Sequence, residues 1–205
     1  MMVVVTGIGR SGTSMMIKWL ASLGLDIGSD TWFDRVNAGL ENEETIRINE
    51  KLITRYVKGA KINHWTIWGR ILDLPHDAVK DPRFLTDQHI IKEWNKARAD
   101  IHVIYMDRKA EHIAASMRRY PEWNTPVYRL FPEMANKKRE EFLTMCAKIN
   151  VPIKVFRYPD VLNNGEDVIE QLWEWLEKFN EGKTYPHQLI TKEKALEKWN
   201  QICKR

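Results

Sequence analysis

The sequence lacks the features that define several large classes of protein. Its 205 residues include only two cysteines, Cys146 and Cys203, which are too few and too isolated for a disulfide framework or a zinc site. No apolar stretch approaches the length that spans a bilayer, and residues 1–6 lead directly into an apolar strand, so no signal peptide is expected. We therefore expect a cytoplasmic protein without a membrane partner.

The sequence also lacks a strong excess of charge. Lysine and arginine (32 together) only slightly exceed aspartate and glutamate (28), which gives a net charge of +4, and the basic residues are spread along the chain. This balance suits an anionic ligand and does not indicate a nucleic-acid partner. Because 43% of the residues are hydrophobic, the chain can bury a full core, and we expect one domain over residues 1–205.

What the sequence does contain is a glycine-rich turn near its start. The β-branched residues 3–5 predict a buried strand, and apolar residues at helical spacing from Met16 onward predict a helix. Between them lie residues 7–14, Gly-Ile-Gly-Arg-Ser-Gly-Thr-Ser. The glycines allow backbone N–H groups to fold around an anion, and the N-terminus of the next helix adds partial positive charge. The turn is therefore predicted to be a phosphate-binding loop.

This loop differs from that of nucleotide hydrolases at one position. Their pattern is G-x-x-x-x-G-K-[ST]; Gly7 and Gly12 fit it, but Thr13 stands at the lysine position. That lysine normally reaches the β- and γ-phosphates, so its absence argues against a nucleoside triphosphate. A cation is present instead at Arg10. The order Arg-Ser-Gly-Thr-Ser resembles the 5'-phosphosulfate loop of sulfotransferases that use 3'-phosphoadenosine 5'-phosphosulfate (PAPS), particularly the branch that contains the tyrosylprotein enzymes.

The resemblance implies a donor site residue by residue. In sulfotransferases an arginine at a strand end and a serine eight residues later hold the 3'-phosphate, and Arg108 and Ser116 have this spacing. Tyr158 begins a segment that resembles the family's Tyr-Glu-Asp-Leu element, whose tyrosine contacts the adenine. No metal is expected, because a sulfuryl group carries less charge than a phosphoryl group, so the cationic side chains of the protein can suffice without Mg²⁺. The residues implied to bind the donor are Gly9, Arg10, Ser11, Gly12, Thr13, Ser14, Arg108, Ser116 and Tyr158.

The resemblance also implies which residues carry the chemistry. Arg10 would neutralise the charge that builds on the departing 5'-phosphate. Glu41 lies eight residues before Asn49, as in the Trp-Glu-Asp to Asn segment of bacterial sulfotransferases, whose glutamate corresponds to the proposed general base of the tyrosylprotein enzymes. Leu40 replaces the aromatic residue of that segment. His64 is a second candidate base, because cytosolic sulfotransferases use a histidine.

A basic turn follows a short strand that is predicted within residues 78–84. Its tetrad Lys80-Asp81-Pro82-Arg83 recurs in bacterial sulfotransferase-like sequences at the carboxyl edge of the second parallel strand, where ligands of open α/β sheets bind. Two interpretations stay open. Lys80 and Arg83 face the sulfate or the acceptor, or Asp81 and Arg83 only stabilise the turn.

Two other functions compete with sulfuryl transfer. The apolar residues before Asp107 resemble a Walker B strand, whose aspartate organises Mg²⁺ in a P-loop kinase that uses ATP. Asp107 could equally be the N-cap of the next helix. A protein of the same fold that binds nucleotide without catalysis is the third hypothesis. Because the Walker lysine is missing while Arg108 and Ser116 are present, we favour the sulfotransferase.

The order of elements predicts the fold. Strands alternate with helices, which indicates an α/β protein with a P-loop NTPase-like three-layer sandwich, in which helices flank a central parallel sheet. Residues 29–39, 58–77 and 120–136 show no clear period and are expected to be loop-rich segments on the acceptor side. The acceptor itself, a hydroxyl or amine of a small molecule, a carbohydrate or a peptide, carries no sequence signature.

Overall fold

A four-stranded parallel sheet forms the centre of the structure. The computed structural model describes residues 1–28, 40–118, 132–178 and 191–203. The strand order is β2-β1-β3-β4, and Val4 of β1 pairs with Val79 on one side and Val103 on the other. Because all four strands run in the same direction, their carboxyl ends meet at one edge. The strands are β1 (Met2–Gly7), β2 (Ala78–Lys80), β3 (Ile101–Asp107) and β4 (Ile153–Arg157).

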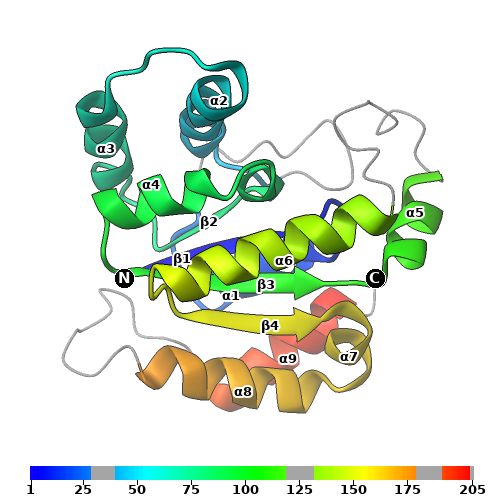
Figure 1. Cartoon of the computed structure of the whole chain (residues 1–205). Coiled ribbons are helices and arrows are strands. Elements are labelled where there is room, and N and C mark those ends of the chain that lie inside the picture. Colours follow the sequence, from blue (N-terminus) through cyan, green and yellow to red (C-terminus); the bar gives the residue numbers. More distant parts are fainter. Residues whose placement is uncertain (29–39, 119–131, 179–190, 204–205) are drawn as a thin grey trace.

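Helices cover both faces of this sheet, as Figure 1 shows. One face packs against α1 (Thr13–Ser22), α7 (Tyr158–Asn163), α8 (Gly165–Lys178) and α9 (Lys192–Cys203). The other face packs against α2 (Glu43–Lys58), α3 (His64–Leu72), α4 (His89–Ala97), α5 (Ala110–Arg118) and α6 (Pro132–Lys148). The predicted α/β class, with a central parallel sheet flanked by helices, is therefore confirmed.

Strand β1 shows why the sheet needs two helical layers. Val3 and Val5 belong to the core on the α1 side, whereas Met2 and Val4 belong to the core on the α4 side. All four side chains are fully buried. A strand that is buried on both faces requires a continuous apolar run rather than an alternating one, which is the pattern at the start of this sequence.

The second predicted strand ends early for a local reason. Strand β2 stops at Lys80, and a short 3₁₀ helix, η1 (Pro82–Leu85), begins after Asp81. The Asp81 side chain accepts a hydrogen bond of 2.9 Å from the backbone N–H of Arg83. Pro82 fixes its own φ and has no N–H to donate to a sheet ladder, so the strand cannot continue through it.

The expectation of a loop-rich segment at residues 58–77 was wrong. The segment contains α3, which begins where Asn63 Oδ1 accepts a hydrogen bond of 3.0 Å from the N–H of Trp65. Ile67 and Ile71 form the buried face of this helix at a spacing of four residues. Aromatic and polar residues lie between these two isoleucines, so the helical spacing of the apolar residues was not recognised in the sequence.

The other boundary differences are smaller. Residues 132–136 of the segment expected to be loop-rich at 120–136 belong to α6, which begins at Pro132. Residues 120–131 of that segment lie outside the described residues, as do residues 29–39. Within the described ranges, every helix is too short or too polar to cross a bilayer.

The C-terminal helix α9 holds α1 in place. The rings of Trp199 and Trp19 meet edge to face with centroids 5.3 Å apart, and Trp19 Nε1 donates to the carbonyl oxygen of Ala195 at 3.4 Å. A Cβ at Gly165, the first residue of α8, would overlap the Trp199 indole. The indole therefore packs between α1 and the start of α8.

We expect Trp199→Ala to lower the free energy of unfolding by about 3 to 5 kcal/mol, because the truncation leaves a cavity between two helices. Urea unfolding followed by far-UV circular dichroism measures this change. Trp173→Ala is the matched control, since the Trp173 indole donates a surface hydrogen bond to Glu177; its cost should be about 1 kcal/mol or less. Equal losses for the two variants would contradict this packing of α9.

Candidate functional site

The loop between β1 and α1 has the geometry of an anion site. Gly12, the N-cap of α1, has φ of 95°, and no side chain caps the helix. A Cβ at this position would overlap the ring of Tyr158, so only glycine fits. The start of α1 thus carries no side-chain cap, and a helix N-terminus of this kind favours an anion.

Two further features of the loop are unusual for a simple connection. Ser11 is fully buried, yet its Oγ has no hydrogen-bond partner among the described residues. A buried hydroxyl without a partner costs about 1 to 3 kcal/mol. Arg10 has φ of 71°, in the left-handed region that non-glycine residues rarely occupy, and such strain concentrates at functional sites. Both features fit a loop shaped for an anionic group such as a phosphosulfate.

The structure brings four of the predicted donor residues together beside this loop. Arg10 Nε donates to Ser116 Oγ at 3.2 Å, and Arg108 Nη1 donates to the carbonyl oxygen of Arg10 at 2.8 Å. The Arg108 guanidinium lies over the ring of Tyr158, 4.5 Å from its centroid. These residues come from the carboxyl ends of β1, β3 and β4 and from α5, so the parallel sheet gathers them at one edge.

A second cation reaches the loop from β2. Lys80 is only 2% exposed, and its Nζ lies 2.9 Å from Ser14 Oγ and 2.5 Å from Glu41 Oε1. Burial lowers the pKa of Lys80, and the Glu41 carboxylate opposes part of that shift. The sequence alone leaves two roles open for Lys80. The feature that favoured a position beside the loop was its place at the carboxyl end of β2, the strand next to β1. The positive charge missing at Thr13 is thus supplied by the neighbouring strand.

Glu41 is held at this place by the chain on both sides of it. Leu40 is buried in the core, with 5% of its surface exposed. Its φ of 88° lies in the left-handed region, as does that of Arg10. On the other side Asn42 is the N-cap of α2, where its Oδ1 accepts a hydrogen bond of 3.0 Å from the N–H of Thr45. The Glu41 carboxylate is consequently fixed against Lys80, one residue before the N-cap of α2.

The turn after Lys80 is built on a buried carboxylate. Asp81 is fully buried and accepts hydrogen bonds from Asn49 Nδ2 at 2.9 Å and from Arg83 Nη1 at 3.1 Å. Trp94 Nε1 in turn donates to Asn49 Oδ1 at 2.8 Å. Burial raises the pKa of Asp81, and the charge of Arg83 lowers it. Asp81 and Arg83 therefore stabilise the turn, as the second interpretation has it, and Lys80 contacts the loop. That Lys80 and Arg83 face the sulfate or the acceptor stays a prediction.

Asp107 is not the N-cap of the helix that follows it. Helix α5 begins at Ala110, and the carbonyl oxygen of Lys109 accepts its first intrahelical hydrogen bonds. The Asp107 carboxylate lies instead 3.3 Å from Nε of Arg139 on α6. This ion pair gives Asp107 a role in joining the end of β3 to α6.

His64 is engaged away from the phosphate loop. Its Nδ1 lies 3.0 Å from Oε2 of Glu93, a buried carboxylate on α4. Glu93 also accepts hydrogen bonds from Tyr56 at 2.8 Å, Trp68 at 3.0 Å and Lys96 at 2.9 Å. Burial by itself raises the pKa of Glu93, but the hydrogen bonds from Lys96, Tyr56 and Trp68 outweigh it and lower the pKa to about 2. His64 thus belongs to a cluster that joins α2, α3 and α4.

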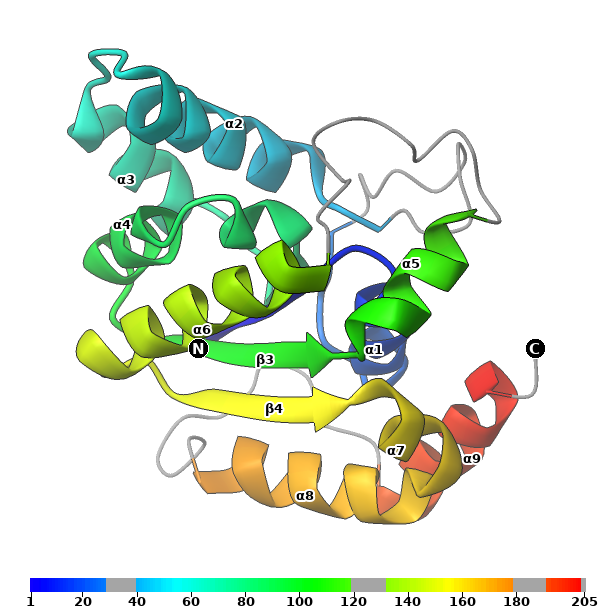
Figure 2. The ribbon, with the colours of Figure 1, turned by 45° about the vertical axis from the view of Figure 1, so that its right-hand side comes forward.

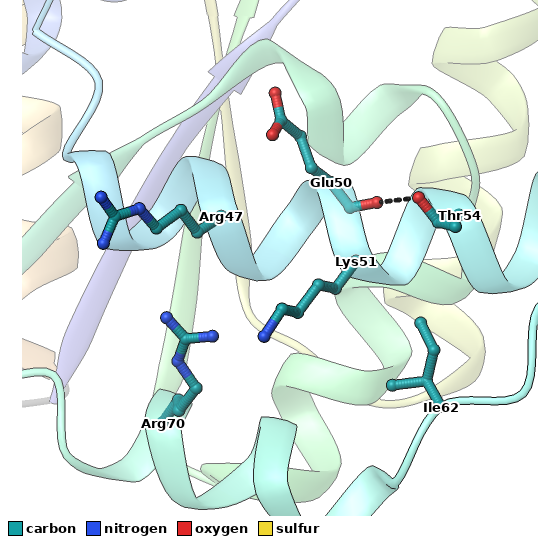
Figure 3. Close-up of a pocket in the computed structure, with 6 residues that line it drawn as sticks. All are labelled: Arg47, Glu50, Lys51, Thr54, Ile62 and Arg70. Carbon is teal, nitrogen blue, oxygen red and sulfur yellow. Dashed lines mark hydrogen bonds between the residues drawn. The ribbon is translucent and has the colours of Figure 1, made fainter.

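A separate depression of about 400 Å³ lies between α2 and α3. Figure 3 shows Lys51 of α2 and Arg70 of α3 directed toward each other, and Arg47 of α2 is also among the residues that line this space. Arg47 pairs with Glu43, and Arg70 pairs with Glu44. None of the residues that line the depression is a predicted donor or catalytic residue, so it is distinct from the loop site.

Comparisons with known proteins bear on the fold. No family model matches the sequence, and no curated protein matches it. A solved structure described as the sulfotransferase domain from the curacin biosynthetic pathway is similar, with a TM-score of 0.54 and 13% sequence identity. The match covers 98% of this chain and 97% of that one. At this identity the likeness is one of fold, and it extends over the whole length of both chains.

The Glu93 cluster makes stability sensitive to acid. A carboxyl whose pKa falls on folding stabilises the protein above its unfolded pKa, near 4.5, and this stabilisation is lost as the pH falls toward 2. The shift corresponds to about 3 kcal/mol. We expect the unfolding free energy of Glu93→Gln, measured by urea titration, to change less than that of the wild type across this pH range. The same acid dependence in both proteins would contradict the lowered pKa.

Proposed function

We propose that this protein is a sulfotransferase that moves the sulfuryl group of PAPS to a hydroxyl or amine of its acceptor. The observation that carries this proposal is the cluster at the phosphate loop, where Arg10 is bonded to Ser116 and Arg108 lies against Tyr158. The likeness to a sulfotransferase domain in fold supports it. The absence of the Walker lysine, with cations supplied by Arg10 and Lys80, also supports a donor other than a nucleoside triphosphate.

The residues around the loop suit the parts of PAPS. The Ser11 hydroxyl and the N–H groups at the start of α1 would bind the 5'-phosphosulfate, together with the Arg10 guanidinium. Arg108 and Ser116 would hold the 3'-phosphate, for which a planar guanidinium gives bidentate hydrogen bonds. The Tyr158 ring would contact the adenine. When bound, PAPS supplies a sulfuryl group on a phosphosulfate anhydride, which a nucleophile can attack.

Residues of this chain would then stabilise the charge that develops during transfer and accept the proton of the acceptor. Glu41 would accept the proton of the acceptor as its hydroxyl or amine becomes a nucleophile. Lys80 lies between the Glu41 carboxylate and Ser14 of the loop, so its charge would stabilise negative charge on the sulfuryl oxygens during transfer. His64 is not proposed as the base, because its ring nitrogen is bonded to Glu93.

We expect calorimetric titration to show that 3'-phosphoadenosine 5'-phosphate binds more tightly than ATP with Mg²⁺. Arg108→Ala should weaken this binding by about tenfold or more, because it removes a charged hydrogen-bond donor from a phosphate. Arg47→Ala is the matched control, since Arg47 lies on α2 and pairs with Glu43; its affinity should equal that of the wild type. Preference for ATP with Mg²⁺ would favour a kinase and contradict the proposal.

Glu41→Gln should separate proton transfer from donor binding. The amide keeps the size of the side chain but cannot act as a base, so we expect transfer to drop by about 10² or more. The affinity for 3'-phosphoadenosine 5'-phosphate should fall far less, because Lys80 loses its paired charge but keeps its contact with Ser14. Transfer is measured with radiolabelled PAPS and the best acceptor from a screen of hydroxyl and amine compounds. Glu43→Gln, at an exposed position two residues on, is the control. Normal transfer by Glu41→Gln would rule out this base.

A further inference from the structure

The hairpin made by the second half of α2 and by α3 has an unusual charge. Residues 51–72 contain no aspartate or glutamate, although the whole chain has 28 of them. The same residues include five positively charged side chains. These are Lys51, Arg55, Lys58, Lys61 and Arg70. Because Arg70 is paired with Glu44 of α2, the positive charge of the hairpin comes from the other four residues.

The hairpin also exposes large apolar side chains. Trp65 is 78% exposed, and Leu72 and Val57 are each 57% exposed. These are the three most exposed of the six large hydrophobic side chains that lie on the surface in the described part of the chain. Trp65, Gly69 and Leu72 follow each other at spacings of four and three residues, so they share one face of α3. A Cβ added at Gly69 would meet no described atom within 4 Å, and the Trp65 ring contacts the Trp68 ring of its own helix edge to face, with centroids 5.2 Å apart.

The fold itself does not need this face. Ile67 and Ile71 bury the opposite face of α3 in the core, and Trp68 is bonded to Glu93. The tip of the hairpin lies at the outer end of the helical layer, away from the sheet, in Figures 1 and 2. An exposed tryptophan on this hairpin lowers the solubility of the protein and does not add to its core. Exposed apolar side chains of this kind are typical of a surface that binds a partner.

We propose that this hairpin docks on the surface of an anionic lipid bilayer. Trp65, Leu72 and Val57 would enter the boundary between headgroups and acyl chains, a position that suits tryptophan and aliphatic side chains. Lys58 and Lys61, both exposed at the turn, would reach the lipid phosphates with their flexible stems.

Other partners suit the hairpin less well. A second copy of this chain would bring two positively charged surfaces together across a symmetric interface, which like-charge repulsion opposes. A nucleic acid or another polyanion would satisfy the lysines but would leave Leu72 and Val57 in water, since aliphatic side chains offer bases no stacking surface. A lipid surface is the partner that uses both the charge and the apolar side chains.

Vesicle flotation with the full-length protein tests the proposal. We expect the protein to float with phosphatidylcholine vesicles that contain about one third phosphatidylserine, and not with pure phosphatidylcholine vesicles. Trp65→Ser and the double variant Lys58→Glu/Lys61→Glu should each reduce the bound fraction by about fivefold or more. The double variant Lys137→Glu/Lys148→Glu on α6 makes the same change in net charge elsewhere and should bind as the wild type does.

Several outcomes would overturn the proposal. These are no flotation with anionic vesicles, equal losses for the two double lysine variants, or full binding by Trp65→Ser, which would indicate adsorption by charge alone. Binding to heparin or single-stranded DNA in place of vesicles would assign the surface to a polyanion instead. Circular dichroism and the affinity for 3'-phosphoadenosine 5'-phosphate should be unchanged in every variant, so that a failure here is independent of the proposed function.

Discussion

The buried ion pair between Lys80 and Glu41 is the interaction on which the candidate site depends. A lysine that is 2% exposed is expensive to bury, and it is tolerated only when its charge is paired and its N–H groups are bonded. Here Nζ meets both the Glu41 carboxylate and the Ser14 hydroxyl. One side chain thereby joins β2, the start of α1 and the residue before α2. Removal of either charge would leave the other buried without compensation.

The residues next to this ion pair form a buried polar network whose groups are hydrogen-bonded to one another. Asp81, directly after Lys80, is bonded to Asn49 of α2, and Asn49 is bonded to Trp94 of α4. Thr6 of β1 donates to the carbonyl oxygen of Asp81 at 3.0 Å. Each of these groups has a fixed partner, so the network specifies the distance of α2 and α4 from the strand ends rather than merely filling space. The position of Glu41 follows from that of α2, because Glu41 directly precedes the N-cap Asn42.

Features encoded by local sequence patterns could be predicted, whereas contacts between residues distant in the sequence could not. The phosphate loop and the pair Arg108 and Ser116 were visible because their spacing lies within one strand, turn or helix. The partnership of Lys80 with Glu41 joins residues 39 positions apart, and no local period encodes it. Helix α3 was missed because its apolar spacing is short and lies among aromatic residues. His64 was a chemically reasonable base, but its partner on α4 could not be found from sequence spacing alone.

Helix α2 relates the two proposed surfaces to each other. Glu41 lies two residues before its first residue and Val57 lies next to its last, and a helix of 16 residues is about 24 Å long. The N-cap Asn42 and the Asn49 bond fix one end, while the other end leads into the exposed hairpin. A bilayer that contacted the hairpin tip would therefore stand off from Glu41 by up to the length of this helix. An acceptor attached to that bilayer would need a polar headgroup long enough to span this separation, whereas a dissolved acceptor would reach Glu41 without constraint from the lipid.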